Sequence, residues 1–175
     1  MNMKKILTIL LAAFTVISLQ AQQNTLDRRF REVREFKSAE KQTQTLTGRL
    51  KYKSPSYLSM EYDNGEYFLI DGKTMSILRD GKKQKFDIDK NLMMKNLSHA
   101  LLYSFQGKND ALALEQNADI ARSAAKDGKK LVVLTARRKQ PQGCSRIDAE
   151  YDKDGNLLSI IIAEFNGNKT SYVWE

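Results

Sequence analysis

The chain has 175 residues, of which 41% are hydrophobic and 29% charged, and a formal net charge of +8. This length suits one domain with its own hydrophobic core and is short for two. Its basic residues are scattered and interleaved with acids, which argues against a nucleic-acid-binding groove. The single cysteine, Cys144, excludes an internal disulfide, and the sequence leaves its role open.

The first 21 residues have the pattern of a secretory signal peptide. Lys4 and Lys5 form a positive start, 6–19 is an apolar run, and Ala21 is a small residue at which cleavage can occur. The apolar run is shorter than the roughly 20 residues that span a bilayer. Gln22, and not a cysteine, follows the proposed cleavage point. We therefore expect export without a lipid anchor, and a single mature domain over 22–175.

Residues 24–38 are predicted to form an amphipathic helix. Leu26, Phe30, Val33 and Phe36 recur at intervals of three or four residues, which places them on one stripe of a helix. We expect this stripe to pack against the rest of the domain.

From residue 46 onward the apolar residues alternate with polar ones, as in half-buried strands. Pairs that suit tight hairpin turns separate the strand-like segments. There are six such pairs, at 64–65, 71–72, 80–81, 127–128, 154–155 and 166–167. They predict an antiparallel meander.

Residues 89–105 interrupt the meander with a second helical pattern. Met93, Leu97, Leu101 and Phe105 recur every four residues, with Asp89 as the expected cap at the start. Residues 109–126 are ambiguous between helix and strand. We expect a loop there, followed by a strand around residue 120 that pairs with 131–135.

The last two segments predict closing strands. Residues 157–165 are apolar on both faces, so the second face requires a cover or lines a cavity. In the final strand, Tyr172 and Trp174 fall on one side. The predicted fold class is mainly β (α+β): a strongly curved antiparallel sheet, or unclosed β-barrel, whose concave face is covered by the two amphipathic helices.

Catalytic groups are scarce in the sequence. His99 is the only histidine, which excludes a histidine-rich metal site. No serine lies in a nucleophile elbow, and no glycine-rich loop is suited to phosphate. We expect no enzymatic activity, no metal and no cofactor.

The apolar interior is the candidate site. Strands are expected to line a hydrophobic cavity that takes lipid, and the second helix to cover it as a lid. The predicted lining residues are Leu50, Tyr52, Leu58, Met60, Tyr62, Phe68, Ile70, Ile77, Met93, Leu97, Leu101, Ile160 and Ile162.

Two motifs, in this order and around these hairpins, resemble the LolA family of periplasmic outer-membrane lipoprotein carriers. The first is Gly48-Arg-Leu-Lys-Tyr-Lys-Ser-Pro55, and the second is the hydrophobic-Asp-Gly-Lys stretch that ends at Lys73. The resemblance covers nearly the whole mature chain. It implies an unclosed β-barrel with a helical lid, in a monomeric periplasmic carrier. Such a carrier receives acylated lipoproteins from an inner-membrane ABC transporter and delivers them to an outer-membrane acceptor.

The sequence departs from the family at the lid. Family members carry an arginine directly before the proline of the first motif, where this chain has Ser54 before Pro55. We therefore expect the gating contact near Pro55 to be absent or moved to another cation, either Arg49 or Lys53. Three alternatives remain: an envelope-sensing binding module of the same fold without transport, a lipid-anchored acceptor, and a hydrolase that uses His99. The acceptor is disfavoured because no lipobox cysteine lies near Ala21.

Overall fold

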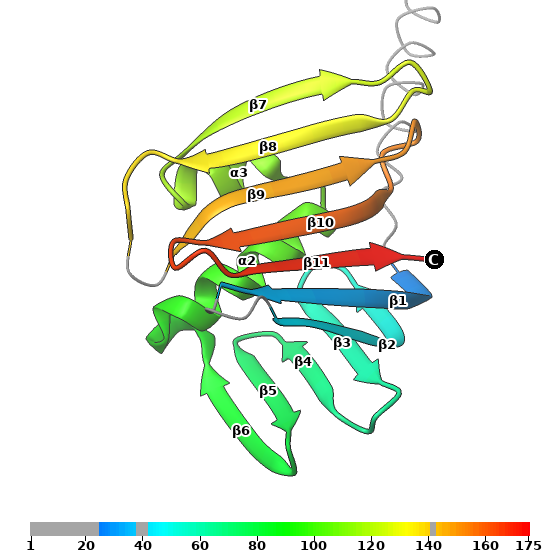
Figure 1. Ribbon diagram of the computed structural model, residues 1–175, viewed down its shortest axis with the longest axis vertical. Coiled ribbons are helices and arrows are strands. Elements are labelled where there is room, and N and C mark those ends of the chain that lie inside the picture. The colour runs from blue at the N-terminus through cyan, green and yellow to red at the C-terminus, as the bar shows by residue number, and fades with distance from the viewer. Residues whose placement is uncertain (1–24, 38–41, 141–142) are drawn as a thin grey trace, which may run out of the picture.

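The computed structural model describes residues 25–37, 42–140 and 143–175, which form one antiparallel sheet with two α-helices against it (Figure 1). The signal peptide predicted at 1–21 lies outside these residues. The strands are β1 (Thr25–Phe36), β2 (Gln42–Lys53), β3 (Tyr57–Tyr62), β4 (Tyr67–Asp71), β5 (Thr74–Arg79), β6 (Lys82–Asp87), β7 (Ala118–Ala124), β8 (Lys130–Ala136), β9 (Cys144–Tyr151), β10 (Leu157–Glu164) and β11 (Lys169–Trp174).

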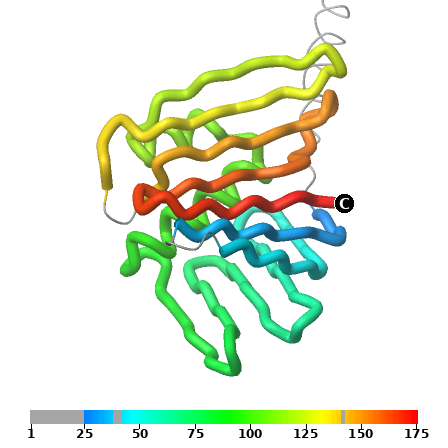
Figure 2. The backbone as a smooth tube through the Cα atoms, viewed as in Figure 1, coloured from blue at the N-terminus to red at the C-terminus, as the bar shows by residue number. Residues whose placement is uncertain are grey.

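The sheet has 11 strands in the order β6-β5-β4-β3-β2-β1-β11-β10-β9-β8-β7. The first strand therefore pairs with the last, and two meanders spread from that pair (Figures 1 and 2). The two edge strands, β6 and β7, lie at opposite ends of the described sheet, which does not close. This arrangement confirms the predicted fold class of a curved, unclosed antiparallel sheet.

All six predicted hairpin turns join consecutive strands of the sheet. The turn between β5 and β6 shows why these residue pairs are needed. Asp80 has a φ of 51° and Gly81 a φ of 71°, the left-handed values that a two-residue hairpin requires. Aspartate tolerates this conformation better than most residues, and glycine adopts it freely.

Helix α2 (Leu92–Phe105) confirms the predicted second helix, although its start differs. A short 3-10 turn, η2 (Ile88–Lys90), takes up the first residues of the predicted span. Asn91 then caps α2, because its side-chain oxygen accepts a hydrogen bond from the Met94 backbone N–H at 3.1 Å. Among the described residues, no helix combines the length and the apolar character needed to cross a bilayer.

Two sequence predictions are wrong. The segment predicted as a helix over 24–38 is strand β1, and the loop predicted after residue 109 begins as helix α3 (Asn109–Glu115). The strand expected around residue 120 and its pairing with 131–135 are confirmed by β7 and β8. In Figure 1 both helices lie behind the sheet, so the two covering helices are α2 and α3.

The error at β1 has a physical reason. In a strand, alternate residues share a face, and the core-facing positions of β1 include Phe30, Glu32 and Arg34. Two charged residues on the buried side remove the alternation that identifies a strand. The helical spacing of Leu26, Phe30, Val33 and Phe36 instead combines residues from both faces of the sheet, and Phe36 is exposed.

Candidate functional site

Ten of the predicted lining residues are buried in the concave face of the sheet or on the helix against it. Each is at most 8% exposed: Leu50, Tyr52, Leu58, Met60, Tyr62, Phe68, Ile70, Leu101, Ile160 and Ile162. The strand register brings them into rows, for example Leu50 beside Met60 and Met60 beside Phe68. Ile160 and Ile162 lie on the same face but belong to the second meander, beyond β1 and β11.

The remaining three lining residues are placed differently. Ile77 and Leu97 are partly buried against the core, whereas Met93 is 49% exposed. Helix α2 buries the next residue, Met94, in place of Met93. The four-residue repeat used to predict the helix thus identified one fully buried residue, Leu101, and two partly buried ones, Leu97 and Phe105, and placed Met93 wrongly.

Two of the residues predicted for gating, Arg49 and Pro55, lie on opposite sides of the sheet. Arg49 is on the convex face, where its guanidinium donates a hydrogen bond of 2.6 Å to the Asp27 carboxylate. This hydrogen bond raises the Arg49 pKa. From this position Arg49 is directed away from the helices. Pro55 is at the helices, because its backbone carbonyl accepts a hydrogen bond of 2.9 Å from the Gln106 side chain. Of the two, only Pro55 contacts the end of α2.

An aromatic cluster joins α2 to the centre of the sheet. The Phe105 ring of α2 stacks on Tyr52 with the ring centroids 4.8 Å apart, and it lies 5.0 Å from the Trp174 ring. Trp174 in turn stacks on Tyr172 at 5.8 Å and lies 6.4 Å from Phe30. We call the four sheet residues Phe30, Tyr52, Tyr172 and Trp174 the aromatic slot, and Phe105 fills it from the helix side.

Among the described residues, two polar atoms inside the slot lack a well-formed hydrogen bond, although the Ser54 side chain lies near the Tyr52 hydroxyl. They are the Tyr52 hydroxyl oxygen and the Trp174 indole Nε1, in residues that are 3% and 4% exposed. A buried polar group without a partner costs about 1–3 kcal/mol. Burial also raises the Tyr52 pKa, which keeps its hydroxyl protonated. The slot therefore contains two donors that a polar ligand atom can satisfy.

A buried ion pair lies next to the slot on β1. The Arg34 guanidinium pairs with Glu32, and the Tyr62 hydroxyl donates to the other oxygen of the same carboxylate. Burial raises the pKa of Tyr62 and of Tyr172, and the Glu32 charge adds to both shifts. Burial is the largest single effect on the Arg34 pKa and lowers it, but the hydrogen bond to Glu32 and the charges of Glu32, Tyr62 and Tyr172 together raise the pKa overall. The sequence reasoning missed this cluster, since residues 32 and 172 are neighbours only through the β1–β11 pairing.

Hydrogen bonds join the C-terminal end of α2 to the sheet. The Tyr151 hydroxyl of β9 lies 2.9 Å from the Ser104 carbonyl oxygen and 3.0 Å from Asn109 Oδ1. The Gln106 bond to Pro55 is the second such contact. Apolar packing of residues such as Leu101 and Leu102 provides the rest. Helix α2 is therefore attached mainly by the kind of contact that an acyl chain can replace.

His99 lies on the side of α2 that faces α3. Its Nδ1 is 2.5 Å from the Glu115 carboxylate, and its ring stacks on Tyr103 with centroids 5.1 Å apart. The side chain is thus engaged between the two helices. Cys144 begins β9, where burial raises the pKa of its thiol to about 11. Its thiol is therefore a poor nucleophile at neutral pH.

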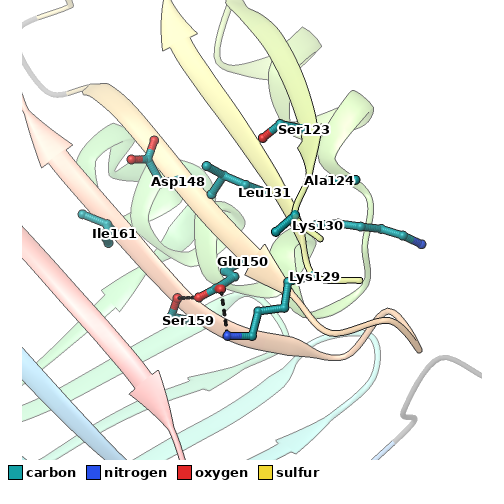
Figure 3. A pocket seen from close by; sticks show the side chains of 10 residues that line it. Ser123, Ala124, Lys129, Lys130, Leu131, Asp148, Glu150, Ser159 and Ile161 are labelled. Carbon is teal, nitrogen blue, oxygen red and sulfur yellow. Dashed lines mark hydrogen bonds and ion pairs between the residues drawn. The ribbon is translucent and has the colours of Figure 1, made fainter. Parts of the chain in front are cut away.

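A separate pocket of about 440 Å³ opens on the other face of the sheet, near the β7–β8 hairpin (Figure 3). Its floor includes Leu131 and Ile161, the outward-facing apolar residues of β8 and β10. Lys129 crosses its rim to Glu150 at 3.6 Å, and Ser159 lies 3.3 Å from the same carboxylate. The second apolar face predicted for 157–165 is thus partly accounted for by this pocket.

No model of a known protein family matches the sequence, and no curated protein matches it significantly. Among solved structures, the chain is similar to a LolA superfamily protein from Nitrosomonas europaea, with 9% identity, a TM-score of 0.39 and coverage of 93% of this chain and 91% of that one. It is also similar to a putative outer membrane lipoprotein-sorting protein domain from Vibrio parahaemolyticus, with 9% identity, a TM-score of 0.43 and coverage of 93% and 88%.

A third similar structure is the MucA/MucB complex of Pseudomonas aeruginosa, with 13% identity, a TM-score of 0.44 and coverage of 93% of this chain and 55% of that chain. At these TM-scores the similarities support no argument about function, which must come from the site itself.

Proposed function

We propose that the protein is a periplasmic carrier that shields the acyl chains of lipoproteins between the concave face of the sheet and α2. The observation that supports this proposal is the aromatic slot, in which Phe105 of α2 packs between Tyr52 and Trp174. Displacement of α2 would vacate this space and leave a wall of aromatic and aliphatic side chains.

The energetics favour an acyl chain as the occupant. Burying a CH₂ group contributes about 0.8 kcal/mol. The free energy of burying one acyl chain of ordinary length therefore offsets the loss of several apolar contacts made by α2. The Tyr52 hydroxyl and Trp174 Nε1 are two buried donors, and an ester carbonyl of a diacylglyceryl group accepts hydrogen bonds. A lipoprotein anchor supplies both kinds of group.

The partners follow from the LolA resemblance. We propose that acylated lipoproteins arrive from an inner-membrane lipoprotein-releasing ABC transporter and leave to an outer-membrane acceptor, with the protein acting as a monomer without a cofactor. Binding and release then depend on the position of α2, and no covalent chemistry is required.

The test is mass spectrometry of material bound to the protein purified from the periplasm of its native cell while release to the outer membrane is blocked. Acylated lipoprotein in the complex is the expected result. A stable protein that never captures lipoprotein would overturn the carrier proposal. Bound free lipid without lipoprotein would favour a sensing module of the same fold.

A matched pair of variants tests the slot. Phe105→Ala removes the side chain that fills the slot, whereas Phe86→Ala removes a partly buried phenylalanine from the edge strand β6. With a fluorescent diacylated lipopeptide as probe, Phe105→Ala is expected to bind about 10-fold more tightly, because the closed state loses packing. Phe86→Ala should bind like the wild type. An equal effect of the two variants would remove the slot from the proposal.

A further inference from the structure

Strand β7 is a free edge of the sheet at the end farthest from β6. In Figures 1 and 2 it is the outermost strand, with β8 on its inner side. Among the described residues no strand pairs with its outer side. Helix α3 does not occupy that edge, because the ion pair between Arg122 and Asp110 ties the helix to the core-facing side of β7. The backbone of β7 is thus open to a further strand.

The register shows which backbone groups point outward. The Ala125 N–H donates to the Lys129 carbonyl, and the Arg137 N–H donates to the Asn117 carbonyl. Hydrogen-bonded pairs in an antiparallel ladder recur every second residue. The odd-numbered residues of β7 therefore bond to β8. Ile120, Arg122 and Ala124 direct their N–H and C=O groups to the free edge.

The two edges of the sheet differ in their protection. Three of the six residues of β6 are lysines, the kind of residue that discourages strand addition. Strand β7 has mostly small side chains, and Ala121, Ser123 and Ala124 are exposed. Small side chains beside an open ladder let a second backbone approach closely.

Basic residues surround β7 at both ends. Lys126, Lys129 and Lys130 lie at the hairpin that joins β7 to β8, and 137–139 is Arg-Arg-Lys at the other end. Asp119 pairs with Arg137 at 2.7 Å, and Asp127 and Glu150 pair with Lys129 at 3.5 and 3.6 Å, so two of these cations already have acidic partners. Lys126 and Lys130 at the hairpin, and Arg138 and Lys139 at the other end, supply the remaining positive charge. An extended segment laid along β7 therefore meets positive charge at both of its ends.

The positive charge at both ends of β7 also favours one kind of partner strand over another. A second copy paired antiparallel through β7 would place the hairpin lysines of one molecule next to the Arg-Arg-Lys segment of the other, and these like charges would repel. An acidic segment is attracted to the same groups. We propose that β7 is a docking edge for an acidic, extended segment of a partner protein, which adds to the sheet as a twelfth strand.

The pocket beside β7 fits this geometry. It includes Ser123 and Ala124 of β7 and has Leu131 in its floor (Figure 3). Side chains of an added strand alternate between the two faces, so every second one lies on the side of the pocket. Apolar residues that alternate with the acids therefore find an apolar surface there. The inference is independent of the proposed lipid site, which lies on the other face of the sheet.

The probe that tests this proposal is a fluorescein-labelled octapeptide of sequence Glu-Val-Glu-Thr-Glu-Val-Glu-Thr, measured by fluorescence anisotropy with the full exported protein at low salt. Its matched controls are the peptide with lysine in place of glutamate and the acidic peptide with all backbone amides N-methylated. We expect each control to bind at least 10-fold more weakly than the acidic peptide.

A variant pair tests the location. Ala124→Pro removes an outward N–H without breaking the β7–β8 ladder, whereas Ala124→Val adds similar bulk and keeps the N–H. Only the proline variant should lose binding, and hydrogen exchange of the outward amides of β7 should slow when peptide is bound.

Three outcomes overturn the proposal: equal binding of either control peptide, slowed exchange at β6 in place of β7, and a concentration-dependent dimer that protects β7 without peptide. The last outcome would assign the edge to a second copy of this chain.

Discussion

The buried ion pair on β1 gives the sharpest stability prediction. Replacing Arg34 with methionine keeps most of the apolar stem and removes the guanidinium, so the Glu32 carboxylate remains buried with the Tyr62 hydroxyl as its hydrogen-bond donor. The side chains of Glu32 and Arg34 are only 1% and 10% exposed, so water cannot replace the lost partner. The variant Arg34→Met should therefore be strongly destabilised.

The expected size follows from this burial. Removing one partner of a buried ion pair costs about 3–5 kcal/mol, a large share of the roughly 5–15 kcal/mol that stabilises a typical domain. Because Tyr62 still donates to Glu32, we expect the lower end, about 3 kcal/mol. The triple variant Glu32→Leu/Arg34→Met/Tyr62→Phe should recover most of the loss, since it removes both charges and the Tyr62 hydroxyl that would otherwise lose its acceptor.

The assay is urea unfolding at pH 7, followed by far-UV circular dichroism with the slope of the transition checked for each variant. The control is Arg49→Met, whose exposed pair with Asp27 has side chains 61% and 45% accessible. This control should unfold like the wild type. If Arg34→Met also unfolds like the wild type, the ion pair is not buried in solution and the reasoning fails.

Three further predictions concern single sites. Gly48→Ala should lose about 1–3 kcal/mol of stability in the same urea assay, because a Cβ there would lie 2.2 Å from the Glu61 carbonyl oxygen; a wild-type midpoint would contradict the close packing. Bonds from Arg29 and Thr47 lower the Asp63 pKa to about 2, below its unfolded value near 3.9, so its stabilisation is present above about pH 4 and is lost as the pH falls toward 2. Asp63→Asn should flatten the dependence of unfolding on pH across that window, and an unchanged slope would refute the assignment. The Cys144 thiol, with a pKa of about 11, should react with iodoacetamide about 10-fold more slowly at pH 7 than a thiol of pKa 9, because its roughly 100-fold lower thiolate fraction outweighs its higher nucleophilicity; labelling at an ordinary rate would contradict the raised pKa.

The hairpins were predictable because their signal is local. A turn such as Asp80-Gly81 depends on the conformations of two adjacent residues, which their own side chains determine. Helix α2 was predictable for the same reason, since its apolar repeat lies within one segment. The capping residue was missed by two positions because Asp89 and Asn91 are both suitable caps, and only the chain path through η2 selects Asn91.

The site was predictable only in part because its contacts are between distant segments. The sequence placed Tyr52 in the interior and Tyr172 and Trp174 on one side of the last strand, which the structure confirms. It did not indicate that Phe105 stacks on Tyr52, 53 positions away in the chain. Glu32 and Arg34 pair within β1, but their burial beside Tyr62 and Tyr172 depends on strand pairing, which no local pattern encodes.

The most direct test of the proposed lipid site uses Trp174, the only tryptophan in the chain. A diacylated lipopeptide with bromine atoms on its acyl chains quenches tryptophan fluorescence only at close range, so it reports whether a bound chain lies in the aromatic slot. We predict strong quenching by the brominated lipopeptide and none by its unbrominated twin at the same occupancy. Binding of both lipopeptides without quenching by either would place the acyl chains elsewhere and contradict the account.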